Sequence, residues 1–108
     1  MHEIISGTKV VNGEEIETWK REIYDANVLE VEAGTNGYKG GDTGHGSRTF
    51  FSIKDCTGTD ITAKVLRDRY GHGYGFSVEL GGDCELTTII KALKFIVKVL
   101  KKQSKESP

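Results

Sequence analysis

The stretch from Gly81 to Leu100, GGDCELTTIIKALKFIVKVL, decides the fold that we expect of this chain. Apolar residues recur in it at the i, i+3, i+4, i+7 spacing of an amphipathic helix: Leu86, Ile89, Ile90, Leu93, Ile96, Val97 and Leu100. Asp83 is placed to accept hydrogen bonds from the free N–H groups of the first turn. The pair Gly81-Gly82 before it favours a sharp turn. The sequence therefore predicts a long helix that begins near Asp83.

This helix is more apolar than one core contact requires. Ala92, Phe95 and Val99 add a second stripe, so the apolar arc covers roughly 220°, against the ~100° that a surface helix needs. The arc can be buried within its own domain, or part of it can lie in a subunit interface. A chain of 108 residues has little protein to cover such an arc. We therefore expect a homo-oligomer, a dimer or a hexamer, that assembles through the C-terminal helix.

Most of the remaining chain has the patterns of β-strands. Apolar and polar positions alternate, or β-branched and aromatic residues cluster, in four segments: Val28–Glu32, Thr49–Ile53, Ile61–Val65 and Phe76–Leu80. We expect one α+β domain over residues 1–100, an antiparallel β-sheet with one long C-terminal amphipathic helix packed on it. Residues 101–108 form a polar tail that we expect to fray.

The segment 14–24 fits two structures. Ile16, Trp19 and Ile23 have helical spacing, whereas Trp19, Arg21 and Ile23 also line one face of a strand. The preceding Asn12-Gly13 is a strong hairpin signal, and for that reason we predict a strand.

Composition excludes several classes of protein. The chain is 36% hydrophobic, with 15 basic and 16 acidic residues, so neither a disordered chain nor a basic footprint for a DNA or RNA duplex is expected. No apolar stretch has the length of a signal peptide or a membrane span. Cys56 and Cys84 are too few for a disulfide framework, although one disulfide between them stays open. We expect a cytoplasmic protein with no membrane partner.

Glycines gather in two stretches, AGTNGYKGGDTGHGSR (33–48) and YGHGYG (70–75). The first is either a flexible hairpin loop or a loop whose N–H groups cradle phosphates, with Gly40 and Gly41 at its centre. Arg48, where this loop meets a strand, can bind phosphate or pair with a carboxylate such as Glu32. Tyr74, between two glycines, is the best candidate for stacking on a base. Neither common nucleotide fingerprint is present.

Catalysis and metal binding have weaker support. His45 beside Asp42 offers a general base, and Cys84 at a helix start offers a thiol with a lowered pKa. No histidine, cysteine or carboxylate has a recognisable zinc spacing. We therefore expect no enzyme activity, no metal and no cofactor.

Two segments, Val28–Asp55 (VLEVEAGTNGYKGGDTGHGSRTFFSIKD) and Val78–Leu100 (VELGGDCELTTIIKALKFIVKVL), resemble small proteins of Firmicutes bacteria and their phages. The chain is similar to the first-described Thoeris anti-defence sponge family. That resemblance implies an anti-defence protein that sequesters a cyclic nucleotide signal, glycocyclic ADP-ribose, in the host cytoplasm without cleaving it. Some members also hold cyclic oligonucleotides and form homohexamers.

The resemblance also implies roles for residues. Arg48 matches the phosphate-contacting arginine and Tyr74 stands at or beside the base-stacking aromatic. Asp83 falls at a polar position that can be asparagine, and Lys101 replaces an arginine. Together with the loop residues Gly40, Gly41, Asp42 and His45, these form the predicted ligand site. The alternatives are a small inhibitor that binds a defence protein through Glu30 and Glu32, and a small nucleotide hydrolase that uses His45 and Asp42.

Overall fold

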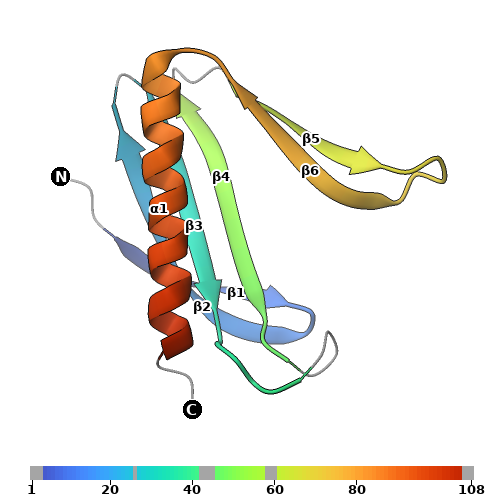
Figure 1. The fold of residues 1–108 in the computed structure, drawn as a ribbon. Coiled ribbons are helices and arrows are strands. Elements are labelled where there is room, and N and C mark those ends of the chain that lie inside the picture. The colour runs from blue at the N-terminus through green and yellow to red at the C-terminus, as the bar shows by residue number, and fades with distance from the viewer. Residues whose placement is uncertain (1–3, 26, 42–45, 58–60, 106–108) are drawn as a thin grey trace.

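One helix lies across one face of a four-stranded sheet, and a separate hairpin projects from it (Figure 1). This computed structural model describes residues 4–25, 27–41, 46–57 and 61–105. Its elements are β1 (Ile5–Val11), β2 (Glu14–Tyr24), β3 (Val28–Thr35), β4 (Thr49–Thr57), β5 (Ile61–Arg67), β6 (Gly73–Leu80) and α1 (Asp83–Lys105). The predicted α+β fold, with an antiparallel sheet and a C-terminal helix packed on it, is confirmed.

The sheet is an antiparallel meander in the order β1-β2-β3-β4. Asn12 and Gly13 form its first turn with φ values of 47° and 83°, and Val11 pairs with Glu14 directly across it. Positive φ at both central residues is what a type I′ hairpin requires, because that turn matches the twist of the strands. The turn therefore sets the register of β2, and the prediction of a strand over residues 14–24 is confirmed.

The core forms where α1 crosses β3. Leu29, Val31 and Ala33 are fully buried and alternate along one face of β3. The helix covers them with Ala92, Phe95, Ile96 and Val99, and β2 adds Ile23 at the edge. A strand with period two and a helix with period 3.6 can each present one apolar face, so two layers suffice for a core at this size.

A buried polar contact fixes the N-terminal part of the helix. The hydroxyl of Thr88 donates to Oδ1 of Asn27 at 2.7 Å, and both residues are at most 1% exposed. Asn27 lies between β2 and β3. Since a buried polar group without a partner is costly, this contact favours one position of α1 along the sheet.

The opposite face of the sheet carries paired charges. Glu32 accepts a hydrogen bond from Thr18 at 2.6 Å and lies 3.7 Å from Nζ of Lys9, while Glu30 lies 3.5 Å from Nζ of Lys54. Glu32 is only 8% exposed. The acidic positions of β3 are thus locally neutralised and do not form an open acidic surface.

The β5–β6 hairpin, hereafter the arm, extends away from the sheet (Figure 1). Val65 pairs with Phe76 and Ala63 with Val78, which places these apolar side chains on one face of the arm. Val65, Tyr74 and Phe76 remain 57%, 70% and 61% exposed. The arm explains why the radius of gyration is 15.3 Å, above the ~13 Å of a compact chain of this length.

The helix uses only part of its apolar arc for this core. Leu86, Ile90, Leu93 and Val97 form a stripe that is 43–59% exposed, hereafter the helix stripe. The helix also continues to Lys105, into the tail that was expected to fray, because Gln103 is bonded to the sheet. No helix among the described residues is long and apolar enough to cross a membrane.

Two isoleucines of α1 test this division of the helix. Ile96 is 6% exposed and Ile90 is 43% exposed. We expect Ile96→Ala to lower the free energy of unfolding by about 2–5 kcal/mol, because it leaves a cavity over β3. Ile90→Ala is expected to cost less than about 1 kcal/mol. Urea unfolding measures both free energies, at protein concentrations over which the urea midpoint stays constant. Equal losses of unfolding free energy in the two variants would contradict this account of the core.

Candidate ligand-binding site

A small pocket lies at the base of the first glycine-rich stretch, next to the end of α1. Its volume is about 170 Å³, and it is lined by Thr35, Gly37, Tyr38, Ser47, Thr49, Leu100 and Ser104. Hydroxyl groups, glycine backbone and one phenol ring make up most of this lining. Such a set offers hydrogen bonds of both polarities and a flat ring for stacking.

Gln103 holds the helix end against this pocket. Its Oε1 accepts from the backbone N–H of Thr35 at 2.9 Å, and its Nε2 donates to the carbonyl of Glu17 at 3.1 Å. The β2–β3 pairing ends at Thr18 and Gly34, so the amide of Gln103 bridges the two strands one position further on. The bridge satisfies backbone groups that the sheet leaves open there.

Gly34 allows the strands to approach closely beside this bridge. A Cβ atom at Gly34 would lie 2.3 Å from the carbonyl oxygen of Glu17 and 2.8 Å from Cα of Thr18. Backbone atoms cannot move aside as a flexible side chain does. Glycine is therefore required at this position for packing.

The two ends of the loop are tied together. The backbone N–H of Asn36 donates to the carbonyl of Arg48 at 3.2 Å, and the N–H of Arg48 donates to Oδ1 of Asn36 at 2.7 Å. The hydroxyl of Thr35 accepts from the N–H of Gly37 at 3.1 Å and lies 3.1 Å from that of Thr49. These bonds fix the loop base, which reduces the ordering cost on binding a ligand.

Arg48 is buried at the base of the loop and connects the loop to β2. Its guanidinium lies 3.2 Å from Oε2 of Glu14 and donates to the carbonyl of Gly46 at 2.9 Å. The residue is only 6% exposed. Of the two roles open to Arg48, the structure therefore shows the ion pair, although with Glu14 and not with Glu32. A phosphate would have to replace or share the Glu14 carboxylate to reach this side chain.

The predicted site residues lie in three separate parts of the molecule. Gly40 and Gly41, both exposed, and Arg48 belong to the glycine-rich loop, and Lys101 lies on the helix turn beside it. Asp83 lies at the helix start, and Tyr74 lies near the beginning of β6 on the projecting arm (Figure 1). Eighteen helical residues, about 27 Å, separate Asp83 from Lys101. Asp42 and His45 lie outside the described residues. A single chain therefore does not bring the whole set together.

Two other aromatic residues of the arm have different surroundings. The ring of Phe76 lies beside the ring of Phe51 on β4, with 6.0 Å between centroids. Tyr70 is 71% exposed and lies beside Arg69, 5.1 Å from ring centre to guanidinium carbon.

None of the seven residues that line the pocket was in the predicted site, and Thr35, Tyr38 and Ser104 are the most informative of them. Tyr38 is 76% exposed and has a glycine neighbour on one side only, a weaker form of the signal that selected Tyr74. Ser104 was missed because it lies in the segment expected to fray. It follows Leu100 by one helical turn, and its hydroxyl donates to the Leu100 carbonyl at 2.6 Å.

Two shifted pKa values lie away from this pocket. A hydrogen bond to the Glu22 carboxylate raises the pKa of the Tyr24 phenol, with burial and the charge of Glu22 adding to the effect. Burial raises the pKa of the Cys56 thiol, and the charge of Glu30 adds to it. A raised pKa leaves less thiolate at neutral pH, so Cys56 is not an activated nucleophile. Cys56 and Cys84 are both free thiols.

Comparison with known proteins yields no match to a protein-family model, a curated protein or a solved structure.

The role of Gln103 can be tested by removing its amide. Gln103→Met keeps the length of the side chain but leaves the N–H of Thr35 and the carbonyl of Glu17 without this bridge. We expect unfolding free energy to fall by about 1–3 kcal/mol and the Thr35 amide to exchange faster with solvent. Ser104→Ala, which removes only a bond within the helix, is the control. Unchanged exchange at Thr35 in Gln103→Met would show that the bridge does not hold the strand end.

Proposed function

We propose that this protein binds a cyclic nucleotide signal, glycocyclic ADP-ribose or a related cyclic oligonucleotide, and sequesters it without cleaving it. Such a sponge acts by affinity and abundance in the cytoplasm of the host cell. It needs no cofactor and no catalytic group. The two segments that resemble the Thoeris anti-defence family form β3, the glycine-rich stretch, β4 and α1, which surround the pocket at Thr35.

The observation that carries this proposal is the fixed base of the glycine-rich loop. Hydrogen bonds tie its two ends at Asn36 and Arg48, so backbone N–H groups and hydroxyls are held in place before a ligand arrives. Preorganised donors suit tight binding of phosphates. Tyr38 at the pocket wall supplies a ring for the base.

The proposal includes a second copy of the chain. Asp83 lies at the start of α1 and Lys101 near its end, so two copies with antiparallel helices would place Asp83 of one copy next to Lys101 of the other. Tyr74 lies on the arm, which projects from the sheet toward the space that a second copy would occupy. The surfaces available for this are the helix stripe and the apolar face of the arm. With about 150–230 Å² for each fully exposed residue, they present on the order of 800 Å², close to the share of one partner in a stable interface.

The inhibitor alternative has one structural feature in its favour. The apolar face of the arm could bind another protein, since Val65, Tyr74 and Phe76 are all more than half exposed. Its original support, an open acidic face at Glu30 and Glu32, is weakened by the ion pairs to Lys54 and Lys9.

The ligand proposal is tested by recovery of the ligand. Purified protein is mixed with glycocyclic ADP-ribose, free ligand is assayed by mass spectrometry, and the mixture is then heated and assayed again. We expect the ligand to disappear from solution and to return unchanged. A converted ligand would support a hydrolase, and a ligand that is never depleted would overturn the proposal and favour a protein partner.

A matched pair of tyrosines locates the binding site. Tyr74 and Tyr70 are 70% and 71% exposed, so neither substitution to alanine is expected to disturb the fold. We expect Tyr74→Ala to weaken binding by about 5–150-fold, as the loss of one stacked base implies, and Tyr70→Ala to change it less than twofold. Calorimetric titration measures both. Equal effects would remove Tyr74 from the site.

Assembly through the helix stripe has its own test. Leu93→Glu places a charge in the stripe, whereas Thr87→Glu places one on another exposed side of the same helix. We expect sedimentation to show an oligomer for the native chain and Thr87→Glu, and a monomer for Leu93→Glu. A native monomer at 100 times the concentration used for binding would contradict the two-chain site.

A further inference from the structure

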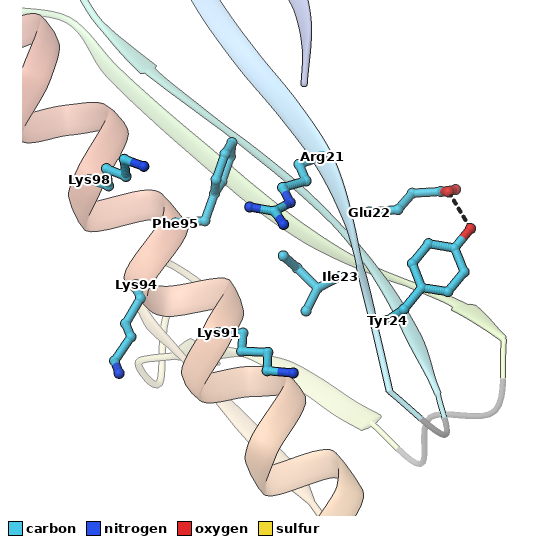
Figure 2. Close-up of a pocket in the computed structure, with 8 residues that line it drawn as sticks. All are labelled: Arg21, Glu22, Ile23, Tyr24, Lys91, Lys94, Phe95 and Lys98. Atoms are coloured by element: carbon cyan, nitrogen blue, oxygen red, sulfur yellow. Dashed lines mark hydrogen bonds between the residues drawn. The ribbon is translucent and has the colours of Figure 1, made fainter. Parts of the chain in front are cut away.

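A groove between β2 and α1 gathers positive charge on the side of the helix that borders the helix stripe, with Lys94 and Lys98 at the boundary. It has a volume of about 390 Å³ and is lined by Arg21, Glu22, Ile23, Tyr24, Lys91, Lys94, Phe95 and Lys98 (Figure 2). Four of these residues are cationic and one is acidic, in a chain whose net charge is −1. The volume lies within the ~300–1,000 Å³ of small-molecule sites.

The acidic residue is already engaged. The Glu22 carboxylate accepts a hydrogen bond from the Tyr24 hydroxyl at 2.7 Å, and both side chains point away from α1 (Figure 2). Within the described part of the chain, the four cations have no hydrogen bond or ion pair to a carboxylate. The described residues therefore do not balance the charge of the groove.

Arg21 is the central feature of the groove. It lies on the helix-facing side of β2, opposite Val31, and its guanidinium points toward α1 beside the ring of Phe95 (Figure 2). Its Nε atom is buried and has no hydrogen-bond partner among the described residues. A guanidinium presents its donors in a planar fork that matches the oxygens of a phosphate. A phosphate in the groove would meet the terminal nitrogens of this guanidinium, which point toward α1 (Figure 2).

Without a bound anion, the lysines of α1 repel one another. Lys94, Lys98 and Lys102 follow each other at i, i+4 spacing, where like charges repel. Lys91 and Lys94 lie in the middle of the helix, too far from its C-terminus to be stabilised by the helix dipole. An anion in the groove would relieve this repulsion.

From these observations we infer that the groove of Arg21, Lys91 and Lys98 is a binding site for a small molecule with two or more phosphate groups. Lys91 and Lys98 are seven residues apart, about 10 Å along the helix, with Arg21 on the facing wall. Two anionic groups on one compact ligand fit this arrangement better than a single phosphate. Phe95 and Ile23 supply an apolar floor for the rest of the ligand. The site is separate from the pocket at Thr35 and does not depend on the proposed function.

The probe is inorganic tripolyphosphate, titrated at low ionic strength against the full chain by calorimetry and by ¹⁵N NMR. We expect binding that is at least tenfold tighter than that of inorganic phosphate, with a shift of the Arg21 Nε–H signal. Lys91→Gln/Lys98→Gln is expected to weaken binding at least tenfold. Lys39→Gln/Lys64→Gln removes the same charge from exposed positions elsewhere, and we expect less than a twofold effect.

The variant Arg21→Gln distinguishes specific recognition of the ligand from general attraction by positive charge. It is expected to weaken tripolyphosphate more than it weakens inorganic phosphate, whereas a diffuse charge effect would change both equally. The inference is overturned if tripolyphosphate at 1 mM does not bind, or if the two lysine pairs have equal effects. It is also overturned if a single-stranded 12-nucleotide DNA binds the groove at least tenfold more tightly, since the surface would then serve a nucleic acid. Circular dichroism of each variant verifies the fold.

Discussion

The burial of β3 beneath α1 is the contact on which the rest of this structure depends. Leu29, Val31 and Ala33 have no exposed surface, and Phe95 and Ile96 cover them. A chain of this size has few alternative ways to build a core. The position of α1 on β3 determines where the glycine-rich loop, the arm and the basic groove lie.

Hydrogen bonds near both ends of α1 fix one position of the helix on the sheet. Thr88 bonds to Asn27 near the helix start, and Gln103 bonds to Thr35 near its end, with 61 and 68 residues of sequence separation. Apolar packing alone tolerates small displacements, whereas buried hydrogen bonds require a fixed geometry. The pocket at Thr35 is therefore held by the same contacts that fix the helix.

Three sides of α1 have different surroundings. One side buries Ala92 and Phe95 in the core, a second exposes the helix stripe, and a third carries the lysines of the basic groove. This division accounts for the apolar arc of roughly 220°, because one part of it is buried within the chain and the other part, the helix stripe, is exposed. The proposed sponge and the proposed phosphate site draw on different surfaces, so they can be tested separately.

The fold could be predicted from the sequence because its elements depend on local sequence patterns. The helix spacing from Leu86 to Leu100, the Asn12-Gly13 turn and the alternation in β3 each specify an element without help from distant residues. The site was not readable to the same degree. Arg48 forms an ion pair with Glu14, which is 34 residues away in the sequence. The last turn of α1 is held by the hydrogen bond between Gln103 and Thr35. Arg21 lies near the lysines of α1 only because β2 and α1 pack together. Periodicity determines which face of an element is buried, but side chains from separate elements meet only where the tertiary structure places them.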